Sequence, residues 1–152
     1  MLEIRNLRAS YGEFEVLHGV DLTVNDGKMV ALLGHNGAGK SALLKAVYGL
    51  LPITGGGVRF GGVDTTHARP FEKSALGIRF VPQEGNVFPS LSVEDNIRLG
   101  ALRLRGERSE LAVRIGEIYG IFPILRERRM APARVLSGGE RQMLAMSIAL
   151  MT

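Results

Sequence analysis

The chain has 152 residues, of which 45% are hydrophobic and 22% charged, and its formal net charge is +4 at pH 7. This length and balance suit one globular domain with a buried core and argue against disorder. The chain has no cysteine, which excludes a disulfide framework and a thiolate metal site.

Neither a targeting segment nor a transmembrane helix is predicted. The N-terminal residues carry charges where a signal peptide needs an apolar core, and the longest apolar run, 143–151, is too short to cross a bilayer. The arginine-rich stretch 98–134 is interpreted as a solvated helical surface, because it lacks the interleaved aromatic residues of single-strand binders. We therefore expect a cytoplasmic protein that binds no nucleic acid and reaches a membrane only through a partner.

The first predicted elements are strands. Apolar and polar residues alternate over 2–12, which predicts a strand that ends in a loop at Tyr11. A second strand is predicted over 16–24, and the residues Asn-Asp-Gly-Lys at 25–28 favour a turn. Residues 29–34 are wholly apolar up to Gly34 and predict a short strand buried on both faces.

The next segment is predicted to mix one helix with further strands. Helical spacing of apolar residues covers 41–51, and Gly49 suits the end of this helix. A strand is expected around 58–60, a loop at 68–73, and another strand over 77–83, where Pro82 interrupts it.

The last part of the chain is predicted to be mostly helical. Ser92 is a plausible N-cap because acidic residues follow it in the first helical turn. Helical character then continues to about Arg129, with an interruption near 120–123. The apolar run 143–151 predicts a helix that is buried on nearly all sides.

A phosphate-binding loop is the clearest motif. The residues GHNGAGKS match G-x-x-x-x-G-K-[ST] in full, after an apolar segment and at the start of a helix. Glycines let successive N–H groups point at phosphate oxygens, the lysine adds a positive charge, and the serine hydroxyl can bind Mg²⁺. The predicted nucleotide contacts are Gly34, Asn36, Gly37, Ala38, Gly39, Lys40 and Ser41.

A second glycine motif, LSGGE, stands near the end of the chain. Ser137 offers a hydroxyl, and Gly138 and Gly139 offer unobstructed N–H groups at a helix start, which suits a phosphate. Ser137 and Glu140 also fit an ordinary capping box, and both interpretations can hold together.

With these two motifs the chain resembles the ATP-binding cassette (ABC) ATPases. The resemblance implies an α/β phosphate-loop NTPase core, with a mixed sheet around the phosphate-loop helix, and a helical subdomain. It divides the chain into an ATP-binding core (1–91), a helical subdomain (92–134) and the signature segment (135–152). It also implies that Tyr11 stacks on adenine, and that Gln83 reaches Mg²⁺ and the attacking water.

The same resemblance implies the cofactors and partners. ATP and Mg²⁺ would bind the phosphate loop, while residues Leu136, Ser137, Gly138, Gly139 and Glu140 would cover the ATP held by a second ATPase subunit. Membrane permease subunits and a solute-binding protein are implied as further partners, with the chain on the cytoplasmic face of a prokaryotic plasma membrane.

Two passages are similar to the cassettes that power branched-chain amino-acid uptake. These are VPQEGNVFPSLSVEDNI, 81–97, and IYGIFPILRERR, 118–129. Gln83 and Arg141 stand where that subgroup often has Glu and Gln, which leaves the transported solute open.

The family's acidic Asp-Glu pair and its γ-phosphate histidine are expected beyond residue 152. We therefore expect a fragment that lacks its general base and does not hydrolyse ATP alone. Two alternatives remain: a non-catalytic nucleotide-binding module, and a DNA-repair or chromosome ATPase with the same signature. The second is disfavoured because no heptad run or cysteine lies between Lys40 and Ser137.

Overall fold

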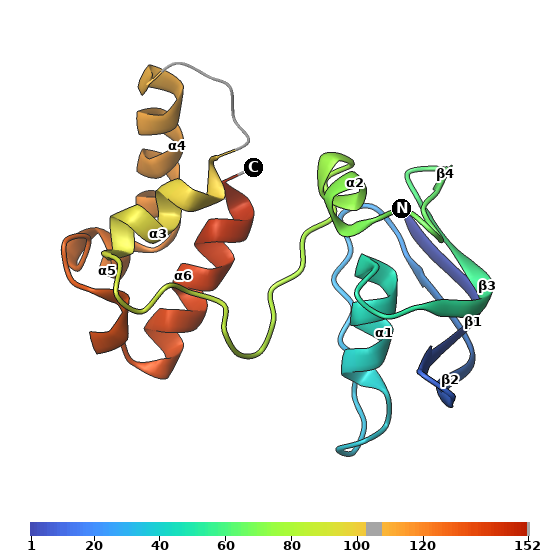
Figure 1. Cartoon of the computed structure of the whole chain (residues 1–152). Helices are drawn as coiled ribbons and strands as arrows, with labels where there is room; N and C mark the ends of the chain where they lie inside the picture. The colour runs from blue at the N-terminus through green and yellow to red at the C-terminus, as the bar shows by residue number, and fades with distance from the viewer. Residues whose placement is uncertain (103–107, 152) are drawn as a thin grey trace. The chain divides into compact units, whose positions relative to one another are not determined.

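The computed structural model describes residues 1–102 and 108–151. The chain forms two compact units, Met1–Arg79 and Phe80–Thr152, and each has its own hydrophobic core (Figure 1). The three-part division drawn from the sequence, with boundaries after residues 91 and 134, stays a prediction.

The first unit is built on a four-stranded antiparallel sheet with the strand order β2-β1-β3-β4. Its strands are β1 (Leu2–Tyr11), β2 (Phe14–Val24), β3 (Ile53–Phe60) and β4 (Val63–Asp64). Its helices are α1 (Lys40–Tyr48) and α2 (Pro70–Ala75). β1 and β2 confirm the two strands predicted first, and Lys28 N–H donates to Asn25 O at 3.1 Å in the predicted turn.

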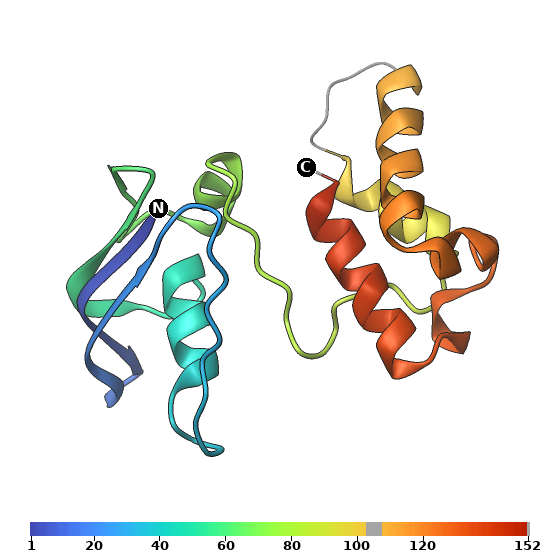
Figure 2. The same ribbon diagram turned by 180° about the vertical axis from the view of Figure 1, so that it is seen from behind.

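Helix α1 supplies the other side of the core of this unit. It packs against the sheet, as both ribbon views show (Figures 1 and 2). The buried side chains of this core are those of Ile4, Leu7, Ala9, Leu17, Ala42, Leu43, Ala46, Val47, Leu51 and Val58. Gly49 ends α1 in the left-handed conformation, as predicted, and its N–H donates to Ala46 O at 3.0 Å.

The predictions of a strand over 29–34 and of another over 77–83 are wrong, because the structure has no strand in either segment. A strand buried on both faces needs hydrogen-bonded neighbours along its edges. Within the described residues the sheet contains only β1 to β4, so neither segment has such neighbours. The side chains of Met29 and Leu33 are 98% and 91% exposed, although Leu32 packs against the core of the first unit.

The prediction of a loop at 68–73 is also wrong, because helix α2 begins at Pro70. Proline is favoured at the first helical position, where its fixed φ fits and its missing N–H is not needed. Arg69 N–H donates to Glu72 Oε2 at 2.7 Å at the start of this helix. The proline therefore marks a helix start here rather than a loop.

A buried lysine joins the two helices of the first unit. Lys73 on α2 is fully buried, and its Nζ donates to Val47 O at 2.7 Å in the last turn of α1. Carbonyl groups at a helix C-terminus favour a nearby cation. Burial lowers the pKa of Lys73.

The second unit is helical. It contains α3 (Val93–Gly100), α4 (Arg108–Ile121), α5 (Pro123–Glu127), the short 3₁₀ helix η1 (Ala133–Val135) and α6 (Gly138–Leu150). Ser92 is the N-cap of α3, as predicted, and its Oγ accepts the N–H of Asp95 at 3.0 Å. The predicted interruption falls at Phe122, between α4 and α5.

Helices α3 and α6 pack closely in the core of the second unit (Figures 1 and 2). Gly100 permits the approach, because a Cβ at this position would lie only 2.4 Å from Ile148 O. On α6, Leu144 is fully buried, whereas Leu150 is 52% exposed. The predicted burial of this apolar helix is therefore confined to one side within this chain. Among the described residues, no helix combines the length and the apolar character that crossing a bilayer requires.

Candidate functional site

The phosphate loop lies in the first unit, between residues 29–33 and helix α1. Gly37 and Gly39 have φ values of 88° and 87°, which side chains other than glycine rarely adopt. Gly39 is also the N-cap of α1, and a Cβ there would lie 3.3 Å from Leu17 Cδ2. The two glycines therefore make the tight turn that leads the chain into the helix.

The ammonium group of Lys40 folds back onto this loop. Its Nζ donates to Gly34 O at 2.7 Å and to His35 O at 2.8 Å. An ammonium has three donors, so these two bonds hold the charge at the loop and leave one donor for a ligand. No carboxylate lies within ion-pair distance of Lys40 in the described part of the chain.

The donors around this loop fit a nucleotide phosphate. The first N–H groups of a helix have no intrahelical partner, and the helix dipole makes this end positive. Lys40 and Ser41 are the first two residues of α1, so the charge of Lys40 belongs to the same positive end of the helix. Ser41 is exposed, and its hydroxyl is the kind of hard oxygen ligand that Mg²⁺ prefers.

Tyr11 lies in the same unit, at the end of β1. Its side chain is 48% exposed, and Lys45 Nζ on α1 lies 5.9 Å from the centroid of its ring. The ring is therefore partly open to solvent, as stacking on a base requires, and Lys45 lies within cation–π distance of it.

The remaining predicted residues lie in the second unit. Gln83 is exposed, in the loop that follows Pro82. The Nδ2 of Asn86 closes this loop by donating to Pro82 O at 3.2 Å, and it also donates to Gln142 Oε1 on α6 at 3.1 Å. The predicted site residues thus divide between the two units, with Lys40 in the first unit and Gln83 and the signature in the second.

The signature residues form the start of α6. Ser137 is the N-cap, and its Oγ accepts the N–H of Glu140 at 3.2 Å, while Ser137 N–H donates to Glu140 Oε2 at 2.7 Å. This confirms the capping box. The bond from the Ser137 N–H lowers the pKa of Glu140, and Arg128, whose Nε lies 3.0 Å from Glu140 Oε1, acts in the same direction.

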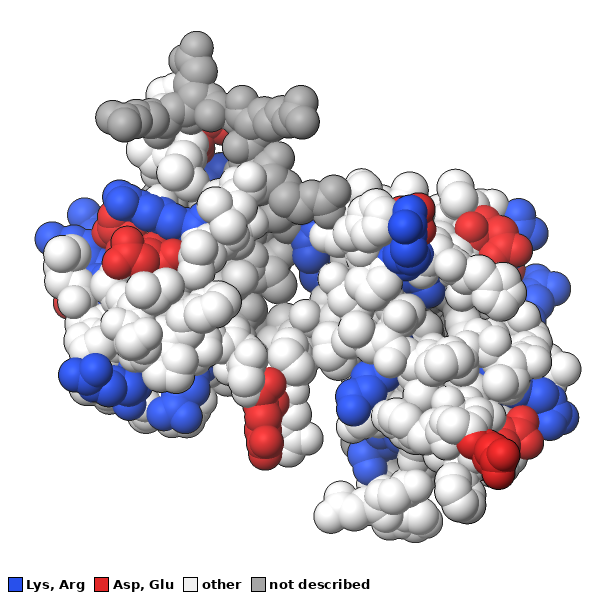
Figure 3. Space-filling model, viewed as in Figure 1, with Lys and Arg blue, Asp and Glu red and all other residues white. Residues whose placement is uncertain are grey.

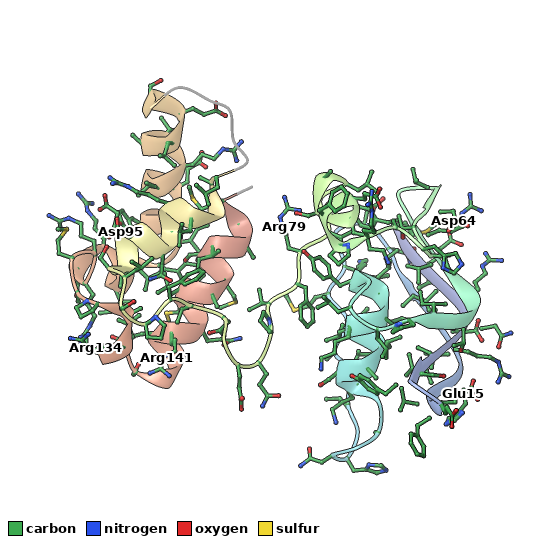
Figure 4. The ribbon with its side chains drawn as sticks, viewed as in Figure 1. Glu15, Asp64, Arg79, Asp95, Arg134 and Arg141 are labelled. Atoms are coloured by element: carbon green, nitrogen blue, oxygen red, sulfur yellow. The ribbon has the colours of Figure 1, made fainter. Side chains whose placement is uncertain are left out.

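Sequence reasoning missed the arginines around this helix start. Arg128 pairs with Glu140, and Arg141 Nη2 donates to Leu136 O at 3.1 Å. Arg134 and Arg141 are drawn near this helix start in Figure 4. The pairing of Arg128 joins two segments that are not neighbours in sequence. The only available signal was the excess of arginine over 98–134, which does not say which arginine reaches Glu140.

Gly138 and Gly139 are open on their outer side. A Cβ at either position would meet no described atom within 4 Å. The packing within this chain therefore does not require glycine at these positions. Glycine stands there even though it destabilises a helix relative to alanine. A group from outside the described residues can approach the backbone closely at this point.

On the face shown in Figure 3, basic and acidic side chains are interspersed over both units. Among the described residues, no group of three or more His, Cys, Asp or Glu side chains could hold a metal ion.

A glycine-rich turn that holds a lysine at the positive end of a helix defines a phosphate-loop nucleotide-binding protein. The ABC transporter family matches residues 17–152, and the chain belongs to this family.

Several curated proteins are similar to the chain. One is a probable branched-chain amino acid transport ATP-binding protein, LivF, of Archaeoglobus fulgidus, to which the chain is 40% identical over 150 residues. This match covers 99% of the chain and 63% of that protein. The chain is 34% identical over 152 residues to the high-affinity branched-chain amino acid transport ATP-binding protein BraG of Pseudomonas aeruginosa, covering 64% of it. It is 37% identical to an sn-glycerol-3-phosphate import ATP-binding protein of Ralstonia nicotianae, covering 40%. The chain thus spans less than two thirds of each of these relatives.

Solved structures of ABC cassettes have the same fold. A nucleotide-free ATP-binding cassette from an ABC transporter matches 99% of the chain with a TM-score of 0.86 and 27% identity, over 64% of that cassette. A dimeric cassette in a post-hydrolysis state, bound to ADP and Pi, matches with a TM-score of 0.83 and 27% identity, over 69% of its length. These matches confirm the fold class expected from the two glycine motifs.

Proposed function

We propose that the chain is the nucleotide-binding part of an ABC import subunit, and that it binds Mg·ATP at residues 34–41. The observation that carries the proposal is the loop itself: left-handed Gly37 and Gly39 lead into α1, and Lys40 Nζ is held on the carbonyl oxygens of Gly34 and His35. Positive charge, helix N-terminus and backbone donors then act on the same phosphates.

Each residue around the nucleotide has a role in this proposal. Lys40 contacts the β- and γ-phosphates, Ser41 holds Mg²⁺ through its hydroxyl, and Tyr11 stacks on adenine. Gln83 reaches the metal and the attacking water. Mg²⁺, when bound, neutralises charge that develops on the phosphate oxygens.

The signature residues serve the nucleotide of a second subunit. Leu136 to Glu140 would cover a γ-phosphate held by the partner's phosphate loop, with the hydroxyl of Ser137 and the N–H groups of Gly138 and Gly139 as donors. Support comes from the open outer side of both glycines and from the similarity to a dimeric cassette bound to ADP and Pi.

Import of branched-chain amino acids is the transport function that we propose. Two of the similar proteins carry that name, whereas others are sn-glycerol-3-phosphate and sulfate/thiosulfate import ATP-binding proteins. The proposed assembly includes permease subunits and a solute-binding protein, with this chain on the cytoplasmic face of the membrane.

For residues 1–152 alone we propose nucleotide binding without turnover. Lys40, Ser41 and Gln83 supply a cation, a hydroxyl and a carboxamide, which bind and orient the phosphates and the metal, and none of these groups is a carboxylate or imidazole base. The residues of the proposed site therefore account for affinity rather than for the hydrolytic step.

Equilibrium binding of a fluorescent ATP analogue in the presence of Mg²⁺ tests the proposal. Lys40→Ala should abolish saturable binding, because the variant loses the charge held at the loop. Lys28→Ala removes a lysine from the exposed turn of the same unit and is the matched control, which should bind like the unmodified chain. Equal binding by the Lys40→Ala chain would refute the proposed site.

A further inference from the structure

The loop that carries Gln83 is fastened to the signature helix by one side chain. Asn86 Nδ2 donates to Pro82 O at 3.2 Å and to Gln142 Oε1 at 3.1 Å. The first bond closes the turn in which Gln83, Glu84 and Gly85 lie. The second bond joins this closed turn to Gln142, at the start of the second turn of α6.

The orientation of both carboxamide groups is fixed by this arrangement. Pro82 O is only an acceptor, so the NH₂ group of Asn86 must face it, and the same group then faces Gln142. Gln142 therefore accepts this hydrogen bond through its side-chain oxygen. A carboxylate at position 142 would keep the acceptor, whereas an apolar side chain would remove it.

The rest of the loop is fastened to the same pair of packed helices. The carboxamide of Asn96, which is fully buried on α3, accepts the N–H of Phe88 at 2.7 Å and donates to Phe88 O at 3.0 Å. Helix α3 in turn packs on α6, where Gly100 meets the backbone of Ile148. Residues 82–88 are thus attached to the two packed helices at Asn86 and at Phe88, and Pro82 is joined to Asn86 within the loop.

We propose that Asn86 and Gln142 are positioning residues, which pre-order the Gln83 loop on the signature helix. Neither side chain touches nucleotide in the proposed site; they act through Gln83. A loop that is already ordered loses less conformational entropy when Gln83 meets the metal, so Mg²⁺ raises nucleotide affinity more with the fastening than without it. This inference rests on the proposed function of Gln83.

The test compares nucleotide affinity with and without Mg²⁺ in the full 152-residue chain, using a fluorescent ATP analogue. Gln142→Leu should reduce the affinity gain given by Mg²⁺ about three- to tenfold, the range that one lost hydrogen bond produces. Asn86→Leu loses two hydrogen bonds and should reduce the gain at least as much, and neither variant should change Mg-free affinity. Gln142→Glu keeps the acceptor oxygen and should therefore keep the affinity gain that Mg²⁺ gives. Ser90→Ala, in the exposed part of the same stretch, is the control and should leave it unchanged.

Two outcomes overturn the inference while the proposed function stands. One is an equal Mg²⁺ gain in the two leucine variants and the unmodified chain, with Lys40→Ala still abolishing binding. The other is a loss in Gln142→Glu as large as in Gln142→Leu, which shows that the hydrogen bond is not responsible. Circular dichroism melting of each variant separates both from unfolding, because a general loss of structure lowers Mg-free affinity as well. Saturable binding that survives Lys40→Ala refutes the proposed function itself.

Discussion

Glu140 joins the start of the signature helix to the preceding segment. Its carboxylate accepts the N–H of Ser137 at 2.7 Å and pairs with Arg128 at 3.0 Å. These contacts favour the charged form, and the pKa of Glu140 is therefore below its ordinary value of 4.5. A lowered carboxyl pKa contributes stability that is present above about pH 4.5 and is lost as the pH falls through the lower value of the folded state.

We therefore predict that Glu140→Gln lowers the free energy of unfolding slightly at pH 7. The difference from the unmodified chain should shrink as the pH falls below about 4.5 and vanish below the lower pKa of the folded state, where the carboxylate of the unmodified chain is also neutral. Urea unfolding at several pH values measures it. Glu127→Gln, the same change on exposed α5, is the control, and a difference independent of pH would contradict the assignment.

The hydroxyl of Tyr119, in the same unit as Glu140, is a second group with a shifted pKa. Burial, followed by the nearby carboxylate of Glu94, raises its pKa to about 12, and its hydroxyl donates to Glu94 Oε2 at 3.2 Å. The unfolded chain releases this proton near pH 10, so this tyrosine should reduce stability between about pH 10 and 12.

Ultraviolet titration of the chain should accordingly show one tyrosine that ionises near pH 12 and is missing in Tyr119→Phe. Glu94→Gln should lower that pKa, because the neutral amide no longer repels the phenolate. A late transition that persists in Tyr119→Phe would assign it to another tyrosine.

At the scale of the elements, sequence signals succeeded where they were local. The N-cap at Ser92, the left-handed Gly49 and the capping box at Ser137 each depend on a few consecutive residues, and the structure has all three. The strands expected over 29–34 and 77–83 depended on neighbours elsewhere in the sheet, which the apolar pattern cannot supply. The glycine turn at Gly37 and Gly39 was predictable for the same local reason, whereas the contacts of Asn86 and Arg128 cross the sequence and were not.

The packing of α3 on α6 gives a prediction with a matched pair of glycines. Gly100→Ala should lower the free energy of unfolding by about 1–3 kcal/mol, because the new Cβ would lie 2.4 Å from Ile148 O. Gly116→Ala on α4 meets no described atom within 4 Å and should instead raise it by up to about 1 kcal/mol through helix propensity. Chemical denaturation followed by circular dichroism measures both, and equal shifts would contradict the proposed close contact.

At the scale of the whole molecule, the proposed nucleotide contacts divide between two units. Lys40 and Ser41 belong to Met1–Arg79, while Gln83 and the signature belong to Phe80–Thr152. Gly139 of the signature is exposed, and a Cβ at this position would meet no described atom within 4 Å apart from its chain neighbours and its own helix. In the proposed dimer, its backbone is instead covered by the nucleotide of a second subunit.

Association of two variants in the presence of Mg·ATP tests whether the signature of one chain covers the nucleotide held by another. Lys40→Ala removes nucleotide binding, and Gly139→Leu blocks the signature while keeping a residue that favours a helix. Light scattering should find neither variant associating alone. Their mixture should form a pair of chains with one bound nucleotide, held by the loop of the Gly139→Leu chain and covered by the signature of the Lys40→Ala chain. A mixture that stays monomeric while the unmodified chain associates would contradict the account, as would full association of either variant alone.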